Sequence, residues 1–152
     1  MAPLALAQEI ARSMKLIVYG TPIPQGSMKA FMPKGGRFPI VTADNKKTKP
    51  WRQAIIDAVM TGDRLVMSED PVHLDVTFFL PRPKSAPKAI YRPAKKPDLD
   101  KLVRAVCDAL TAAGVWHDDS QVVGIWAKKM FAGGVNDVSD GIPRAMIEVT
   151  EV

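Results

Sequence analysis

Four segments of the chain combine β-branched and aromatic residues with an alternation of apolar and polar positions, a pattern typical of strands. They are residues 15–23, 72–80, 121–131 and 143–152. The second is the clearest, because Leu74, Val76 and Phe78 fall on one face of an extended chain. The pattern therefore predicts four strands.

Two further segments carry apolar residues at helical spacing. Within residues 45–62, Pro50 suits the first helical position and Gly62 suits the end. Between them runs an apolar stripe of Trp51, Ala54, Ile55, Ala58 and Val59. Residues 98–113 repeat this periodicity, and Gly114 ends it. The sequence thus predicts a mixed α/β (α+β) fold, with a roughly four-stranded mixed sheet and two main helices.

The length of the chain and the positions of its proline-rich segments favour a single domain. At 152 residues the chain can bury one hydrophobic core. We expect this domain to span residues 15–152. Residues 1–14 are expected to form an N-terminal extension, because they are few, include Glu9 and lack the basic region of a signal peptide. Two proline-rich segments, 22–39 and 81–97, are predicted as irregular loops of the same domain.

Composition limits the classes of function. Apolar residues make up 47% of the chain and charged residues 24%. The net charge is +5 and the isoelectric point about 9.4, an excess that favours a polyanionic partner. The single cysteine, Cys107, excludes an internal disulfide and a cysteine-based zinc site, and it fits a reducing compartment. No apolar run approaches the roughly 18 residues of a membrane span, so no membrane partner is expected.

Basic residues collect in the two proline-rich loops. The first loop carries Lys29, Lys34 and Arg37 among glycines and phenylalanines, which suits a nucleic-acid strand. The second loop contains six basic residues and no acidic one, and it closes with Lys95 and Lys96 before its last proline. These five cations are the candidates for DNA binding. The alternative is an ordinary surface hairpin and a solvated flap.

Two acidic pairs flank the second predicted helix, Asp98 with Asp100 and Asp118 with Asp119. Because Asp98 stands at an N-cap position and Asp100 in the first turn, one interpretation is helix capping. The other is a divalent-metal site, since carboxylate oxygens suit Mg²⁺ or Mn²⁺ and two like-charged pairs brought together need a cation between them. A helix of about 24 Å separates the pairs, so adjacent strands would have to carry the second back to the first.

Several cations near the first pair can stabilise negative charge at a phosphorus atom. They are Lys95, Lys96, Lys101 and Arg104. Arg104 lies one turn after Asp100, and its alternative role is an intrahelical ion pair with Asp100 and Asp108. The chain has no phosphate-binding loop, dinucleotide fingerprint or GxSxG nucleophile elbow.

The stretch PDLDKLVRAVCDAL, followed by GVWHDDSQVV and the lysine-bearing AKKM, resembles the RusA family of Holliday junction resolvases. The earlier segment PIPQGSMKAF is also similar to the opening of that family, so the resemblance touches most of the chain from about Leu16 onwards. It implies a small, dimeric, Mg²⁺-dependent endonuclease of phage and prophage genomes. It further implies that Asp98, Asp100 and Asp119 are the catalytic carboxylates and that Asp118 is an accessory or structural acid.

Two positions depart from the family pattern. The family usually has Asn where this chain has Lys101, and a functional Lys where this chain has Arg104. Arginine keeps the positive charge and the affinity for phosphate but does not readily donate a proton. Arg104 is therefore poorly suited to proton transfer, which makes Lys101 the stronger candidate for that role.

We expect from these features a Mg²⁺-dependent, structure-selective endonuclease that resolves Holliday junctions in DNA recombination and repair, with Mn²⁺ as an alternative metal. It would act in the cytoplasm, that of the host if a phage encodes it. A homodimer suits a four-way junction, because two symmetric sites can nick two opposed strands. The alternatives are a nuclease for other branched DNA and a basic DNA-binding protein whose acids only cap a helix.

Overall fold

The four segments with strand patterns form one sheet in the computed structural model of the protein. The structure describes residues 12–26, 28–43, 46–62, 68–87, 92–134, 137 and 141–152. The strands of the sheet are β1 (Ser13–Tyr19), β4 (Val72–Leu80), β5 (Val122–Phe131) and β6 (Arg144–Glu151). Their order is β1-β6-β4-β5, with β4 and β5 parallel and the other neighbours antiparallel. The predicted mixed sheet of four strands is confirmed.

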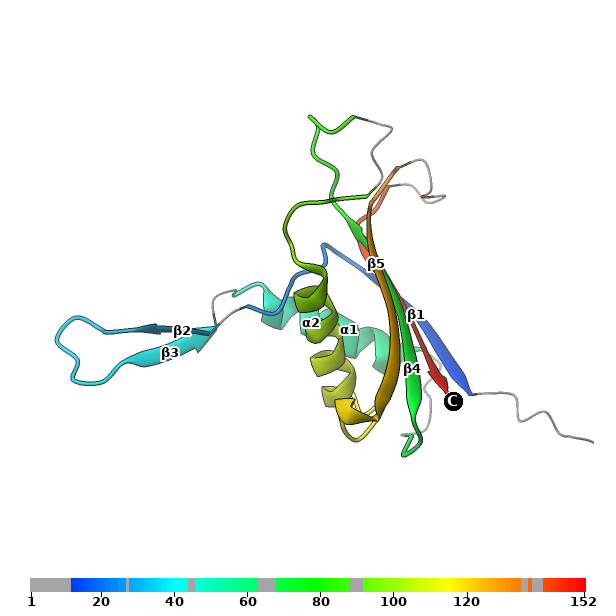
Figure 1. Cartoon of the computed structure of the whole chain (residues 1–152), viewed down its shortest axis with the longest axis horizontal. Helices are drawn as coiled ribbons and strands as arrows, with labels where there is room; N and C mark the ends of the chain where they lie inside the picture. The colour runs from blue at the N-terminus through cyan, green and yellow to red at the C-terminus, as the bar shows by residue number, and fades with distance from the viewer. Residues whose placement is uncertain are drawn as a thin grey trace, which may run out of the picture.

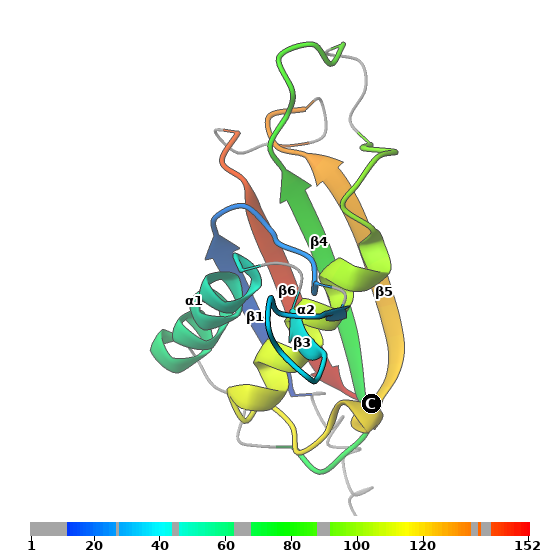
Figure 2. The same ribbon diagram turned by 90° about the vertical axis from the view of Figure 1, so that its left-hand side faces the viewer.

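Both predicted helices form, and they cover the same face of the sheet (Figure 1). They are α1 (Thr48–Thr61) and α2 (Leu99–Ala112), which pack against each other in front of the strands in Figure 2. Two parallel strands need a long crossover connection, and α2 lies within the one that joins β4 to β5. No helix in the described part of the chain is long and apolar enough to cross a bilayer.

The hydrophobic core lies between the helices and the sheet. Leu74, Val76 and Phe78, which the alternation placed on one face of β4, are fully buried. Trp51, expected in the stripe of α1, is also buried. Helix α2 contributes the buried side chains of Leu102, Ala105, Val106, Cys107, Ala109 and Leu110. At roughly 1.5–3 kcal/mol for each large apolar side chain removed from water, this layer holds α2 firmly on the sheet.

Several details differ from the sequence-based expectations, including the end of β1 at Tyr19 instead of residue 23. β1 begins at Ser13, and Met14 is buried in the core, so the strand starts two residues before the expected domain boundary. α1 begins at Thr48, with Pro50 inside its first turn, where a missing N–H breaks no intrahelical bond. The first proline-rich loop contains a hairpin of β2 (Met28–Phe31) and β3 (Ile40–Ala43), which projects from the helix side of the sheet (Figure 1).

A buried ion pair ties the connection between β5 and β6 to the sheet. The guanidinium of Arg144 donates to both carboxylate oxygens of Asp137, at 2.8 and 3.2 Å. The same carboxylate accepts the backbone N–H of Gly133 at 2.7 Å, and Arg144 stacks 3.9 Å from the ring centroid of Phe79. Because both charges are removed from water, loss of either partner would leave an uncompensated buried charge.

The only cysteine has the environment of a core residue. Cys107 is buried, and loss of hydration, with smaller contributions from the charges of Asp119 and Asp108, raises the pKa of its thiol to about 11. The thiolate is the reactive form. Near pH 8 only about one Cys107 in a thousand is then ionised in the folded protein.

We therefore expect Cys107 to resist alkylation in the native state. Labelling by iodoacetamide near pH 8 should be at least about 100-fold slower than in urea-unfolded protein, as followed by mass spectrometry. Free cysteine added to the same native sample serves as a control for the reagent. Comparable labelling rates in the folded and unfolded protein would contradict the burial of this side chain.

Candidate active site

The first acidic pair stands at the exposed N-terminus of α2. Asp98 is the N-cap residue in extended conformation, with φ −71° and ψ 135°, but its side chain makes no capping hydrogen bond. One of its carboxylate oxygens lies 3.8 Å from the ammonium group of Lys101. Asp100 follows in the first turn, also exposed. The capping interpretation therefore fails for the side chain of Asp98, whose carboxylate faces a cation and solvent.

Lys129 of β5 fixes the chain just before this pair. Its ammonium group donates hydrogen bonds to the carbonyl oxygens of Lys95, at 2.7 Å, and Pro97, at 2.8 Å. Lys129 pairs in register with Phe78, so it projects on the helix side of the sheet, in phase with the core-facing Phe131. The sequence analysis did not select Lys129. Lys129 occupies a strand position whose neighbours on the same face are apolar, and that pattern could have identified it as a candidate.

The loop after β1 closes the other side of the site. The backbone N–H of Gln25 donates to the carbonyl oxygen of Lys101 at 2.9 Å, and the hydroxyl of Thr48 donates to the carbonyl oxygen of Pro24 at 2.8 Å. A hollow of about 320 Å³ lies between these segments. Its lining residues are Pro24, Lys96, Pro97, Asp98 and Lys101. The structure thus brings Asp98, Lys96 and Lys101 to one concave surface.

Arg104 is exposed on α2, one turn beyond Asp100. Among the residues that the structure describes, it forms no ion pair with Asp100 or Asp108. Asp108 instead lies 3.9 Å from the guanidinium of Arg52 on α1. The alternative of a purely intrahelical ion pair is therefore wrong, and the guanidinium of Arg104 faces solvent.

The second acidic pair begins the short 3-10 helix η1 (Asp119–Gln121), where Asp118 has a structural task. The carboxylate of Asp118 accepts the backbone N–H of Ser120 at 2.8 Å, which lowers its pKa. The side-chain carbonyl of Gln121 in turn accepts the backbone N–H of Asp118 at 3.1 Å, completing a capping box. Gln121 also donates to the carbonyl oxygens of Ser68 and Asp70, so Asp118 helps to anchor the start of β5.

Asp119 is exposed, and it lies near the second half of α2. Its charge contributes to the raised pKa of Cys107, which is eight residues, or about 12 Å, along the helix from Leu99. Within the described part of a single chain, no three His, Cys, Asp or Glu side chains come together as a metal site would require. Asp98 and Asp100 thus both stand at the N-terminus of α2, whereas Asp118 and Asp119 follow its C-terminus.

The candidate DNA contacts come from two loops. Lys34 and Arg37 are exposed in the connection between β2 and β3, and Lys29 lies in β2, its side chain outside the described part of the chain. Lys95 and Lys96 are exposed just before α2. Both loops are on the helix side of the sheet or at its end, as the acidic pair is (Figure 1).

Comparison with known proteins identifies the family. The model of the family described as Endodeoxyribonuclease RusA matches residues 20–150. An uncharacterized protein of Bacillus subtilis (strain 168), YqaN, is 31% identical over 129 residues, which cover 78% of this chain and 88% of YqaN. The crossover junction endodeoxyribonuclease rusA of Lactococcus phage r1t is 38% identical over 82 residues, 54% of this chain and 56% of the phage protein.

The matched region contains the whole arrangement described above. Residues 20–150 include the loop of Gln25, both acidic pairs, α2 and Lys129. The family suggested by the motifs around Asp98 and Asp119 is thereby confirmed. The chain belongs to the RusA family of endodeoxyribonucleases.

Proposed function

We propose that this protein is an endonuclease that resolves four-way DNA junctions by metal-assisted hydrolysis of a phosphodiester. Family membership supports the class of reaction. The single structural observation that carries the site assignment is the carboxylate of Asp98, which stands at an N-cap position without capping. A carboxylate that is exposed, bordered by Lys96 and Lys101 in a hollow and followed by Asp100 is suited to bind a cation next to a phosphate.

The proposed metal is Mg²⁺, with Mn²⁺ as the alternative. Mg²⁺ commonly binds proteins through one or two carboxylates and completes its ligands with water and substrate phosphate. Asp98 and Asp100 fit that requirement without further acids. Within one chain α2 separates the second acidic pair from this site, so the family motif alone supports our proposal of Asp119 as a third catalytic carboxylate and of Asp118 as an accessory acid. When bound, the ion would offset the negative charge that develops on the phosphoryl oxygens.

The cations around Asp98 and Asp100 differ in what their charged groups contact: one lies beside a carboxylate, one is exposed, and one is bound to the backbone. Lys101, whose ammonium group lies 3.8 Å from Asp98, puts a positive charge beside that carboxylate, where it can also meet a phosphate oxygen. Arg104 is exposed on the next turn, which supports the proposal that it binds a phosphate oxygen. Lys129 acts as a positioning residue, because its ammonium group is occupied by two backbone carbonyls.

The two alternative functions have less support. A non-catalytic DNA-binding protein was attractive because its acids would have served as helix caps, and the side chain of Asp98 does not cap α2. A nuclease for other branched DNA remains within the same family chemistry. The relative rates on four-way, three-way and linear substrates decide between it and the proposed resolvase.

A homodimer is part of the proposal. The face of the sheet opposite the helices carries Ile17, Trp126 and Met146, which are 45%, 63% and 42% exposed, and no described element covers it. Ile17 and Met146 are neighbours in register between β1 and β6. A second copy related by a two-fold axis would bury these side chains and match the symmetry of a four-way junction.

Replacing Asp100 tests the catalytic assignment. We expect Asp100→Asn to slow Mg²⁺-dependent nicking of a synthetic four-way junction by about 100-fold or more while binding in EDTA is preserved, because the amide keeps the shape but loses the charge. The measurement is a gel assay of end-labelled strands. Asp57→Asn, an equivalent change on α1, should cut at the wild-type rate. Wild-type cleavage by Asp100→Asn would refute the assignment.

The role of the basic loop is tested through salt dependence. A Lys95→Ala/Lys96→Ala variant should bind the junction more weakly, and the slope of log K against log salt should become shallower by about 1.8 if each lysine neutralises one phosphate. Binding is measured by fluorescence anisotropy in EDTA. The charge-preserving Lys95→Arg/Lys96→Arg variant is the control and should keep the slope. An unchanged slope in the alanine variant would exclude phosphate contacts at these lysines.

The dimer is tested by sedimentation velocity at micromolar concentration. The wild-type chain should sediment as a dimer, and Ile17→Glu/Met146→Glu should sediment as a monomer, because four carboxylates would meet across the two-fold axis. Met60→Glu, an exposed apolar position on α1, serves as the matched control. A wild-type monomer would contradict the dimer, and a dimeric double variant would place the interface elsewhere.

A further inference from the structure

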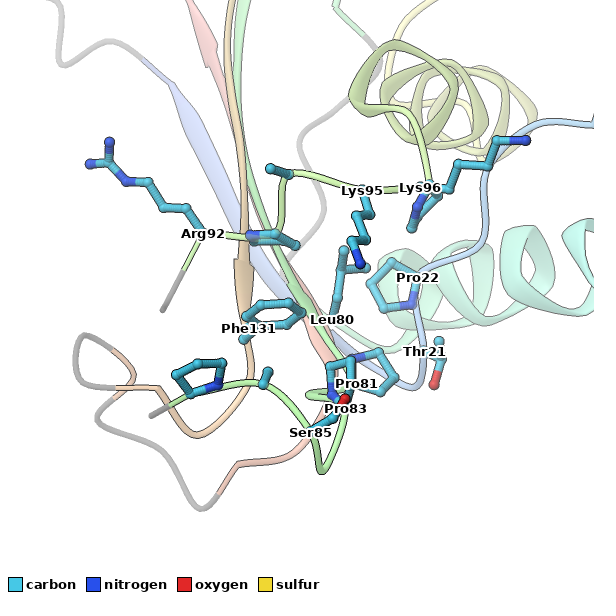
Figure 3. A pocket seen from close by; sticks show the side chains of 15 residues that line it. Thr21, Pro22, Leu80, Pro81, Pro83, Ser85, Arg92, Lys95, Lys96 and Phe131 are labelled. Atoms are coloured by element: carbon cyan, nitrogen blue, oxygen red, sulfur yellow. The ribbon is translucent and has the colours of Figure 1, made fainter. Parts of the chain in front are cut away.

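A cavity of about 540 Å³ lies at the carboxyl ends of the two parallel strands (Figure 3). Leu80 is the last residue of β4 and Phe131 the last of β5, and both side chains face the cavity. Crevices at the carboxyl ends of parallel strands are the usual ligand sites of open α/β sheets. The volume lies within the range of about 300–1,000 Å³ typical of pockets for small molecules and cofactors. The position and size both suit a bound group.

The walls of this cavity are apolar and formed largely by proline. Pro22 comes from the loop after β1, and Pro81 and Pro83 come from the loop after β4. The second loop is braced by its own hydrogen bonds, from the backbone N–H of Ala86 to the carbonyl oxygen of Pro83 at 3.0 Å and from Arg82 to the carbonyl oxygen of Pro87. Because proline has no N–H, these walls offer flat apolar surface and few backbone donors.

The charge around the cavity is positive. The side chain of Lys95 points between Pro22 and Leu80, while Arg92 and Lys96 extend outward on either side (Figure 3). The described lining residues include no carboxylate. The occupant should therefore have a flat apolar part for the walls and an anionic part for Lys95. A nucleotide has both, in its base and its phosphate.

The cavity adjoins the acidic pair directly. Lys96 and Pro97 line both the cavity and the hollow that contains Asp98. Lys129 holds the two carbonyl groups of this short segment, so the wall that separates cavity and hollow is fixed. A strand whose phosphate lies at Asp98 can thus place a neighbouring base in the cavity.

We propose that this cavity takes an unstacked nucleobase of the substrate strand and that this is how the protein distinguishes branched from linear DNA. The inference rests on the function proposed above. Removing a base from its stack costs free energy, and the cost is smallest where the base is already unpaired, as at a branch point. Since the walls offer stacking surface and few donors, the cavity accepts any of the four bases.

The test uses 2-aminopurine, whose fluorescence rises when it leaves a base stack. Four-way junctions are prepared with this base at each nucleotide that flanks the branch point, one position per junction, together with linear duplexes of the same sequence. Binding in EDTA separates the measurement from cleavage. With wild-type protein we expect a rise of at least twofold at one or more branch positions and no rise in the duplex.

The matched variants fill the cavity without changing its charge. Ala94→Leu/Ser85→Leu adds apolar volume at two lining residues, and Ala94 and Ser85 are exposed. This variant should lose the fluorescence rise and reduce the preference for junction over duplex at least fivefold. Met60→Leu, an exposed position on α1, should behave as the wild type. Circular dichroism confirms folding, and the single variant Ser85→Leu replaces the double variant if that one is unfolded.

Each result bears on one of the two proposals. The base pocket is overturned if the wild-type protein binds and cuts junctions without any fluorescence rise. It is also overturned if the rise persists in the filled variants. Neither result contradicts the proposed nuclease activity. A rise in wild type that the filled variants lose, with no metal-dependent cutting, supports the pocket and overturns the nuclease. Equal effects on junction and duplex would show that the cavity binds DNA without selecting its structure.

Discussion

The parallel pairing of β4 and β5 is the constraint on which the rest of this structure depends. Parallel neighbours cannot be joined by a tight turn, so the chain must cross over the sheet, and α2 is part of that crossover. Its N-terminus lies toward the carboxyl end of β4 and its C-terminus toward the start of β5. The two acidic pairs, which flank α2 in the sequence, are consequently held at different ends of one helix whose inner face is buried. The core that fixes α2 on the sheet also fixes their separation.

The first acidic pair is positioned by a lysine that makes no contact with it. Lys129 binds the carbonyl oxygens of Lys95 and Pro97, so the segment ahead of Asp98 is anchored to β5. Helix N-termini carry unpaired N–H groups and a partial positive charge, which favour a nearby carboxylate or phosphate. Since the side chain of Asp98 does not cap those groups, they remain directed at the space where a phosphate would approach. The proposed phosphate site and the proposed metal site would thereby share one helix end.

The sequence predicted most of the fold because its apolar positions are regular. The alternation of Leu74, Val76 and Phe78 and the periodicity of α2 each correspond to one buried face. The prediction was weaker where pairing depends on distant residues. The segment of β2 and β3 was predicted as an irregular loop, with a surface hairpin as the alternative, because its many glycines and prolines obscure the pattern of two short strands that pair with each other.

The candidate site residues also divide into features that the sequence could predict and features that it could not. The four acids around α2 and η1 could be selected from their clustering, and the family resemblance set Asp118 apart as an accessory or structural acid, but which of them caps a helix could not be predicted. Asp118 and Asp98 both occupy N-cap positions in extended conformation, yet only Asp118 caps, because Ser120 and Gln121 complete its box. Lys129 was not selected because its partners are backbone carbonyls 34 and 32 residues earlier, which no residue type reveals, so its place on the apolar face of β5 was the one available signal.

The location of the proline-lined cavity connects chemistry to substrate choice. An electrostatic surface alone binds every form of DNA, because phosphate spacing differs little between a linear and a branched duplex. To distinguish branched from linear DNA, the binding free energy must include a contribution that depends on how easily the DNA deforms. Unstacking a base costs roughly a few kcal/mol within a duplex and less where pairing is interrupted. Lys96 and Pro97 border both the cavity and the hollow of Asp98, so such a term would act beside the bond to be cut. The basic loop can then contribute both to DNA affinity and to the preference for branched DNA, through different residues.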